Sequence, residues 1–166
     1  MWTEFWSLSG IDTADGNQAL IVKLKICWVG KTKEGPIEAL TNEYVKRLGR
    51  YLPTSAHELR SEGALLELAG KERNRPVMVM LDSRGRQMSS EQLAECLRRH
   101  QAGGTQTLMF AVGPADGWSE KARSAATECL SLSEMTLAHE IARVVLLEQL
   151  YRACTILAGH PYHLGH

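Results

Sequence analysis

The segment Leu130–His166 begins L-S-L-S-E-M-T-L at residues 130–137, continues through an apolar stretch at residues 138–158, and leads into G-H-P-Y-H at residues 159–163. The apolar stretch predicts a helix that is apolar on almost every face, unlike a surface helix with one buried stripe. At about 21 residues it would be long enough to cross a bilayer. However, Arg143, Glu148 and Arg152 lie within it, and charges are costly at membrane depth. We therefore expect no membrane partner and a helix surrounded by protein, including a second subunit.

Length and composition set the outer bounds. A chain of 166 residues is most simply one domain with a sizeable core. Its 19 basic and 19 acidic side chains permit a nucleic-acid partner without arguing for one. The four cysteines are widely spaced, form no C-x-x-C pair and accompany no secretory signal. Reduced thiols and a cytoplasmic location are therefore expected.

Residues 1–21 differ from the rest of the chain. They show neither helical nor strand periodicity and end in a polar cluster that is typical of a flexible segment. We expect them to be an extension outside the domain, either disordered or preceding the true start, and the domain to comprise residues 22–166. The alternative is that Trp2, Phe5 and Trp6 dock on the domain.

Residues 22–129 alternate between strand and helix patterns. Strands are expected at residues 22–29, 55–59, 76–81 and 106–112, with a polar loop at residues 82–86, and helices near Pro36, Leu65, Ser89 and Ser119. Ser89 and Gln92 have the spacing of a capping box, and the helix after Ser119 is expected to extend to Cys129. This alternation predicts an α/β domain with a mainly parallel sheet. Ligands bind such sheets at the carboxyl ends of strands, here after Leu81, after Val112 and near residues 132–137.

Several motifs occur in one order along the chain: V-K-L-K-I-C-W-V-G-K-T-K at 22–33, L-D-S-R-G at 81–85, V-G-P-A-D-G at 112–117, L-S-L-S-E-M-T-L-A-H at 130–139, E-Q-L-Y-R-A at 148–153 and H-P-Y-H at 160–163. With these motifs the chain resembles the RlmH family of SPOUT-type rRNA methyltransferases. The resemblance implies an α/β fold with a C-terminal trefoil knot, a homodimer, and S-adenosylmethionine bound in the knotted loops. It also implies methylation of N3 of a pseudouridine in large-subunit (23S) rRNA, within the assembled ribosome.

The resemblance also implies which residues bind the cofactor. They are Leu81, Gly113, Leu132, Ser133, Glu134, Met135, Thr136 and Leu137. Methyl transfer from a sulfonium is an in-line displacement, so most of the catalysis can come from holding donor and acceptor in near-attack geometry. Gly113 has no Cβ and would let the backbone approach the ligand closely.

The tail and the apolar helix supply the catalytic candidates. We expect the tail to lie near the cofactor loops, with His163 managing the target proton, because a histidine pKa lies near working pH. Tyr162 would orient the base, and Arg143 or Arg152 would hold phosphate. For Arg143, pairing across the dimer stays an equal alternative, and Glu148–Arg152 is the spacing of an ordinary helix pair. His160-x-x-His163 is too small a set to predict a metal site.

The sequence also departs from the family pattern. Leu164 follows the second tail histidine, where family members usually have a basic residue, and the region at residues 52–71 is shorter than usual. Two other functions therefore stay open. The same scaffold could act on another RNA such as a tRNA, or it could be a catalytically inactive ribosome-binding or RNA-binding module. Cofactor affinity separates the last of these from the two enzymes.

Overall fold

The computed structural model describes residues 21–164, without the side chain of His163. The predicted N-terminal extension therefore lies outside the described residues except for Ile21, which is exposed. Five strands form one sheet in the order β2-β1-β4-β3-β5, and every neighbouring pair is parallel. The strands are β1 (Lys23–Val29), β2 (Thr54–Leu59), β3 (Val77–Gln87), β4 (Thr107–Val112) and β5 (Glu128–Ser131). The predicted α/β class is confirmed.

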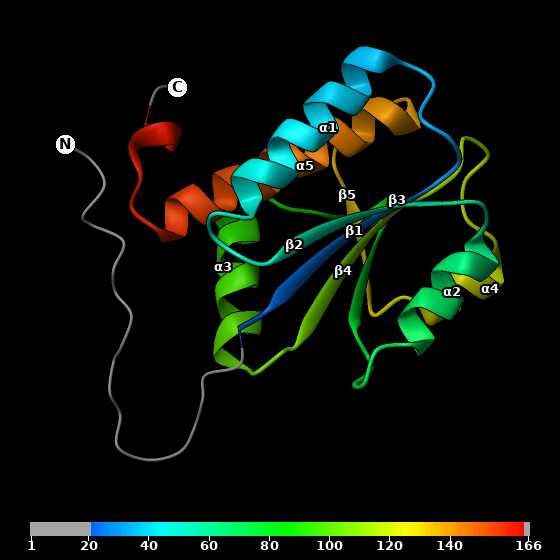
Figure 1. The fold of residues 1–166 in the computed structure, drawn as a ribbon, viewed down its shortest axis with the longest axis horizontal. Coiled ribbons are helices and arrows are strands. Elements are labelled where there is room, and N and C mark those ends of the chain that lie inside the picture. The colour runs from blue at the N-terminus through cyan, green and yellow to red at the C-terminus, as the bar shows by residue number, and fades with distance from the viewer. Residues whose placement is uncertain (1–20, 165–166) are drawn as a thin grey trace.

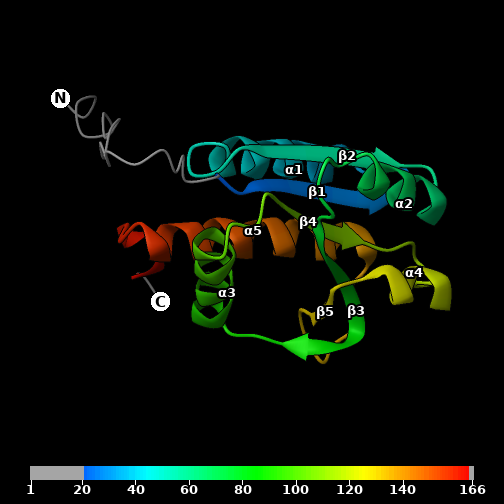
Figure 2. The same ribbon diagram turned by 90° about the horizontal axis from the view of Figure 1, so that it is seen from below.

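Helices cover both faces of this sheet. They are α1 (Gly35–Leu48), α2 (Glu62–Gly70), α3 (Ser90–Ala102), α4 (Glu120–Ala125) and α5 (His139–Leu157), followed by the short 3-10 helix η1 (Pro161–His163). Figures 1 and 2 show α1, α3 and α5 on one face and α2 with α4 on the other. Within residues 21–164 no helix combines the length and apolarity needed to cross a membrane.

The strand sequences explain the two layers, because successive side chains of a strand point to opposite faces. In β1, Leu24 and Ile26 pack in the core under α1, α3 and α5, whereas Cys27 packs in the core under α2 and α4. All six residues of β4, the central strand, are buried. A strand buried on both faces reads as a continuous apolar run, which is the pattern that predicted it.

Local signals place the helix starts as expected. Pro36 lies in the first turn of α1. The Ser89 hydroxyl accepts a hydrogen bond from the Gln92 N–H and the Gln92 side chain accepts one from the Ser89 N–H, so the predicted capping box is formed at α3. Ser119 caps α4 in the same way through the Ala122 N–H.

Two predicted elements were wrong. The helix after Ser119 ends at Ala125, and Cys129 belongs to β5 instead of the helix. The polar residues 82–86 do not leave the sheet as a free loop, because β3 breaks register with β5 after Leu81 and rejoins it at Arg86. Gly85 lies in this bulge, where a Cβ would be 2.6 Å from backbone carbons of Cys129 and Leu130. Only glycine fits against the neighbouring strand there.

Candidate active site

A cavity opens at the carboxyl ends of β4 and β5, beside the bulge in β3 that follows Leu81. Its space is about 760 Å³ with the part open to solvent included. Its walls come from the bulged part of β3, the loops after β4 and β5, α4 and the first turn of α5. The lining residues are Leu81, Asp82, Ser83, Val112, Gly113, Pro114, Ala115, Gly117, Trp118, Arg123, Leu130, Ser131, Leu132, Ser133, Met135, Thr136, Leu137, His139 and Ala142. Seven of the eight predicted cofactor residues therefore meet in one cavity. The exception is Glu134, which is exposed and is not part of the lining.

Trp118 connects the loop that follows β4 to strand β3. Its indole N–H donates a hydrogen bond to the Leu81 carbonyl at 2.8 Å, and its side chain is buried. A Cβ on Gly113 would lie 2.9 Å from Cε2 of the same indole. The absence of a side chain at Gly113 is therefore explained by Trp118, whereas we had expected close approach of a ligand. Trp118 itself was missed, because a lone tryptophan after a turn carries no pattern in the sequence.

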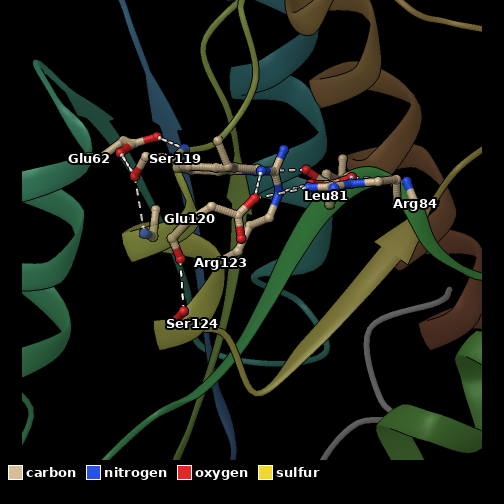
Figure 3. A network of polar contacts seen from close by, with 10 residues as sticks. Glu62, Leu81, Arg84, Ser119, Glu120, Arg123 and Ser124 are labelled. Atoms are coloured by element: carbon tan, nitrogen blue, oxygen red, sulfur yellow. Dashed lines mark hydrogen bonds and ion pairs between the residues drawn. The ribbon is translucent and has the colours of Figure 1, made fainter.

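Two charged groups, Asp82 and Arg123, line the cavity and bond to each other. Arg123 Nε donates to Asp82 Oδ2 at 2.7 Å, and Arg123 Nη1 donates to Glu120 at 2.9 Å (Figure 3). The Arg84 N–H donates to Asp82 Oδ1 at 2.9 Å. Burial alone would raise the pKa of the Asp82 carboxyl, but the bonds from Arg123 and Arg84 outweigh it and hold the pKa below its ordinary value.

The start of α4, which carries Arg123, is fixed by Glu62 from α2. The Ser119 N–H and hydroxyl donate to the two oxygens of Glu62 at 2.8 and 2.6 Å (Figure 3). These bonds lower the pKa of Glu62. Arg123 therefore extends from a helix whose first turn is held on both sides, by its own serine cap and by a neighbouring helix.

The loop at residues 131–137 is shaped by its own serines. The Ser131 hydroxyl donates to the Ser133 carbonyl at 3.0 Å, and the Ser133 hydroxyl accepts from the Met135 N–H at 2.9 Å. Ser131 is buried, whereas Met135 is 70% exposed. This loop leads directly into α5, whose residues His139 and Ala142 complete the lining.

The C-terminal tail does not lie at this cavity within one chain. Tyr162 packs against Tyr151 at 4.8 Å between ring centroids, and its hydroxyl donates to Glu148 at 3.2 Å. Burial raises the pKa of Tyr162 to about 12. These contacts lie on the middle and the second half of α5, a helix of 19 residues. The expected approach of the tail to the cofactor loops is therefore not made within the single chain, where α5 runs away from those loops (Figure 1).

The remaining catalytic candidates are His163 and Arg143. The side chain of His163 lies outside the described part of the structure. The Arg143 side chain is 1% exposed, and its guanidinium carbon lies 4.2 Å from the centroid of Trp28. Its Nε and Nη2 have no hydrogen-bond partner among the described residues, and burial lowers its pKa. In the single chain the Arg143 side chain is therefore shielded from solvent and stacks on the Trp28 ring in a cation–π contact.

Comparison with known proteins gives a family. Residues 22–163 match the family model described as a predicted SPOUT methyltransferase. The chain is 55% identical over 146 residues to ribosomal RNA large subunit methyltransferase H of Koribacter versatilis, a match covering 87% of this chain and 100% of that protein. It is 42% identical over 152 residues to the protein of the same name from Geotalea daltonii, covering 86% and 99%.

Solved structures agree on the fold. The tRNA (m1G37) methyltransferase from Aquifex aeolicus superposes with a TM-score of 0.55 at 13% identity, covering 87% of this chain and 73% of that one. The SpoU methyltransferase AviRb from Streptomyces viridochromogenes, in complex with AdoMet, superposes with a TM-score of 0.51 at 15% identity. That match covers 89% of this chain but 64% of AviRb, so the chain spans slightly less than two thirds of it. On the family match and the close full-length relatives, this chain belongs to the SPOUT methyltransferase family.

Proposed function

We propose that this chain transfers a methyl group from S-adenosylmethionine to N3 of a pseudouridine in large-subunit rRNA, within the assembled ribosome. The observation that carries the proposal is the cavity at the carboxyl ends of β4 and β5, where Leu81, Gly113 and the loop at residues 132–137 meet. Relatives named as ribosomal RNA large subunit methyltransferases match nearly their whole length. The chain is a methyltransferase that uses S-adenosylmethionine, as its family membership implies.

The cavity suits this cofactor. Its walls combine apolar side chains such as Leu81, Leu132 and Leu137 with backbone groups of the β3 bulge and the two loops, which are able to hydrogen-bond an adenine edge. Bound S-adenosylmethionine supplies an activated methyl group on a sulfonium. The residues of the chain then have to hold that methyl in line with the acceptor nitrogen and exclude water. We infer that Glu134 contributes through its backbone, because its side chain is exposed and outside the lining.

We also infer a C2 homodimer and a C-terminal trefoil knot. In support of the dimer, α5 leaves apolar side chains uncovered in the single chain, with Ile141 46% and Leu157 38% exposed. In support of the knot, the loop at residues 131–137 shares one cavity with Leu81 of β3 and with the loop that follows Val112. Two α5 helices packed antiparallel would bring the tail of each subunit to the cavity of the other.

In that dimer the tail would act on the partner's substrate. The acceptor N3–H is a weak acid, so a group has to accept its proton, and we propose His163 for this step. We propose that Tyr162 orients the base. For the phosphate contact we favour Arg152 over Arg143, because Arg152 is partly exposed and lies 5.1 Å from the Tyr162 ring, whereas Arg143 is buried. Arg143 is then a positioning residue that fixes α5 on Trp28.

The test is nucleoside mass spectrometry of rRNA from a strain that lacks the gene, with and without complementation. We expect N3-methylpseudouridine to disappear from large-subunit rRNA and to return with the intact gene. If the lost modification is instead found in tRNA, the rRNA assignment is wrong. If no modification is lost and the purified protein does not bind S-adenosylmethionine, the chain is a binding module and the enzymatic proposal fails.

A further inference from the structure

The cavity has two charged residues, Asp82 and Arg123, which lie next to each other. Asp82 and Arg123 belong to β3 and α4, whereas the loop at residues 132–137 and Ala142 lead into α5. Because α4 and α5 cover opposite faces of the sheet (Figure 1), Arg123 reaches the cavity from the α4 face and Ala142 from the α5 face. A ligand with one charged end and one apolar end would fit this arrangement of charged and apolar lining residues.

The pair has capacity for more hydrogen bonds. A guanidinium has five N–H donors, and the bonds from Arg123 to Asp82 and Glu120 use one Nε–H and one Nη1–H. Asp82 accepts one bond on each oxygen, from the Arg84 N–H and from Arg123, whereas a carboxylate has about four acceptor sites. The Asp82 side chain is 6% exposed and that of Arg123 is 26% exposed. Both groups line the cavity and have unused hydrogen-bond sites, and Asp82, which also forms an ion pair with Arg84, is the more shielded from water.

We propose that Asp82 and Arg123 bind the amino-acid end of the methyl donor, Asp82 taking the α-ammonium and Arg123 the α-carboxylate. This inference rests on the proposed cofactor cavity and goes further in assigning its two charged residues. The methionine part of S-adenosylmethionine is a zwitterion, and adjacent groups of opposite charge are its complement. Arg binds carboxylates through a planar fork of donors. The adenosine would then lie toward Leu137 and Ala142.

The arrangement is also preorganised, which favours recognition over a purely structural role. Glu120 on one side and Asp82 on the other fix the guanidinium plane, and the Ser119–Glu62 bonds fix the helix that carries it. A binding group whose orientation is already fixed loses little entropy when the ligand arrives. An exposed helix pair lacks this support: Arg98 bonds to Glu95 on α3 with side chains 57% and 51% exposed.

The experiment is isothermal calorimetry with three ligands and matched variants. S-adenosylmethionine and S-adenosylhomocysteine both carry the amino-acid end, whereas 5′-methylthioadenosine has the same nucleoside and sulfur but lacks it. The variants are Arg123→Leu, Arg123→Lys and Asp82→Asn, and the control is Arg98→Leu, which removes an arginine from the same i,i+3 helix pairing outside the cavity. Thermal unfolding of each variant checks the fold.

We expect Arg123→Leu and Asp82→Asn to weaken both ligands that carry the amino-acid end by roughly 10- to 100-fold, the usual loss for a charge-assisted hydrogen bond. Arg123→Lys should recover part of the loss. Binding of 5′-methylthioadenosine, and all binding by Arg98→Leu, should stay unchanged.

Three results would overturn the inference. Equal weakening of all three ligands would mean that the pair shapes the cavity or contacts the nucleoside. Weakening of S-adenosylmethionine alone would mean that Asp82 senses the sulfonium. Unchanged binding of every ligand would remove both residues from recognition. If the unmodified protein binds none of the three ligands, the proposed cofactor cavity itself fails, which is a different outcome from a failure of the two-residue assignment.

Discussion

At the residue scale, single side chains of the cavity hold its loops together. Trp118 connects the loop after β4 to β3 through its bond to the Leu81 carbonyl, and its ring lies against Gly113 of the same loop. Asp82 connects β3 to α4 through Arg123. The Trp118–Leu81 and Asp82–Arg123 contacts each join residues that are far apart in the sequence. A substitution at one of these residues should therefore disturb both of the segments that the contact joins.

A methyl group at Gly113 tests the first contact. Gly113→Ala would put a Cβ 2.9 Å from the Trp118 ring, so the protein should lose about 1–3 kcal/mol of stability by overpacking and bind S-adenosylmethionine more weakly. Gly70→Ala is the control, since no atom lies within 4 Å of a Cβ there and its backbone φ is not positive. Denaturant unfolding and calorimetry make the measurement. Full stability and full affinity in Gly113→Ala would show that Trp118 moves freely.

Acid should weaken the fold partly through Asp82. Its pKa in the folded protein lies below the ordinary value of 3.8, so the ionised carboxylate stabilises the fold above that value. The stabilisation is lost as the pH falls through the lower folded pKa. Asp82→Asn should therefore be less stable than the unmodified protein at neutral pH, and the difference should shrink in acid. A difference that is constant from pH 7 to pH 2.5 in thermal unfolding would argue against this role.

At the element scale, α5 is the most informative helix because it contributes to the core, the cavity and the exposed apolar surface. Leu146, Leu147 and Leu150 are fully buried against the sheet, α1 and α3. Ile141 and Leu157 are exposed on its outer side. The prediction that α5 is surrounded by protein is therefore met only on part of its circumference, and the rest is what the proposed dimer would cover.

Two substitutions on α5 separate folding from assembly. Leu147→Glu buries a charge in the core and should unfold the protein. Ile141→Glu should leave the fold intact and convert the dimer to monomer, as seen by circular dichroism and light scattering at micromolar concentration. Lys71→Glu, an exposed charge change beside α2 on the other face, is the control. A dimer that survives Ile141→Glu would place the interface elsewhere.

The tail carries the catalytic prediction. His163→Ala should lower the rate of methyl transfer by roughly a hundredfold, within the range for a general base, and leave cofactor affinity unchanged. Single-turnover kinetics with saturating rRNA substrate, paired with calorimetry of the same variant, make the measurement. Tyr162→Phe is a milder companion that removes only the hydroxyl bonded to Glu148. An unaltered rate in His163→Ala would exclude His163 from the reaction.

The sequence predicted those parts that depend on local chemistry. The capping box of Ser89 and Gln92 and the buried run of β4 depend only on residues that are close together in the sequence. The cofactor residues that line the cavity were predicted from the family motifs. Trp118 and Arg123 escaped prediction because their partners lie 37 and 41 residues away. Cys129 of β5 was predicted to be helical because Ala126 and Cys129 continue the spacing of Ala122, whereas the strand depends on pairing with β3.

At the scale of the whole molecule, the family match covers residues 22–163. The first core residue of this range is Val22, which is 1% exposed, and Ile21 before it is 66% exposed. The order β2-β1-β4-β3-β5 puts the first strand of the chain beside the centre of the sheet. Folding therefore has to bring distant segments together before the cavity exists.

Deletion of residues 1–21 tests this boundary. The shortened protein should unfold at the same temperature and bind S-adenosylmethionine with the same affinity, because the core and the cavity are built from residues beyond them. Calorimetry and thermal unfolding of the two forms give the comparison. A large loss in either would show that Trp2, Phe5 and Trp6 pack on the domain.

The indole in the cavity wall has a spectroscopic consequence. The chain has four tryptophans, and two of them, Trp2 and Trp6, precede residue 22. In a protein shortened to start at Val22, light absorbed near 295 nm would therefore be emitted by Trp28 and Trp118 alone. Trp28 lies beside Arg143, whereas Trp118 lines the cavity. The fluorescence emission of Trp118 should change when a ligand fills the cavity. Cofactor binding could therefore be followed by intrinsic fluorescence, without an attached dye.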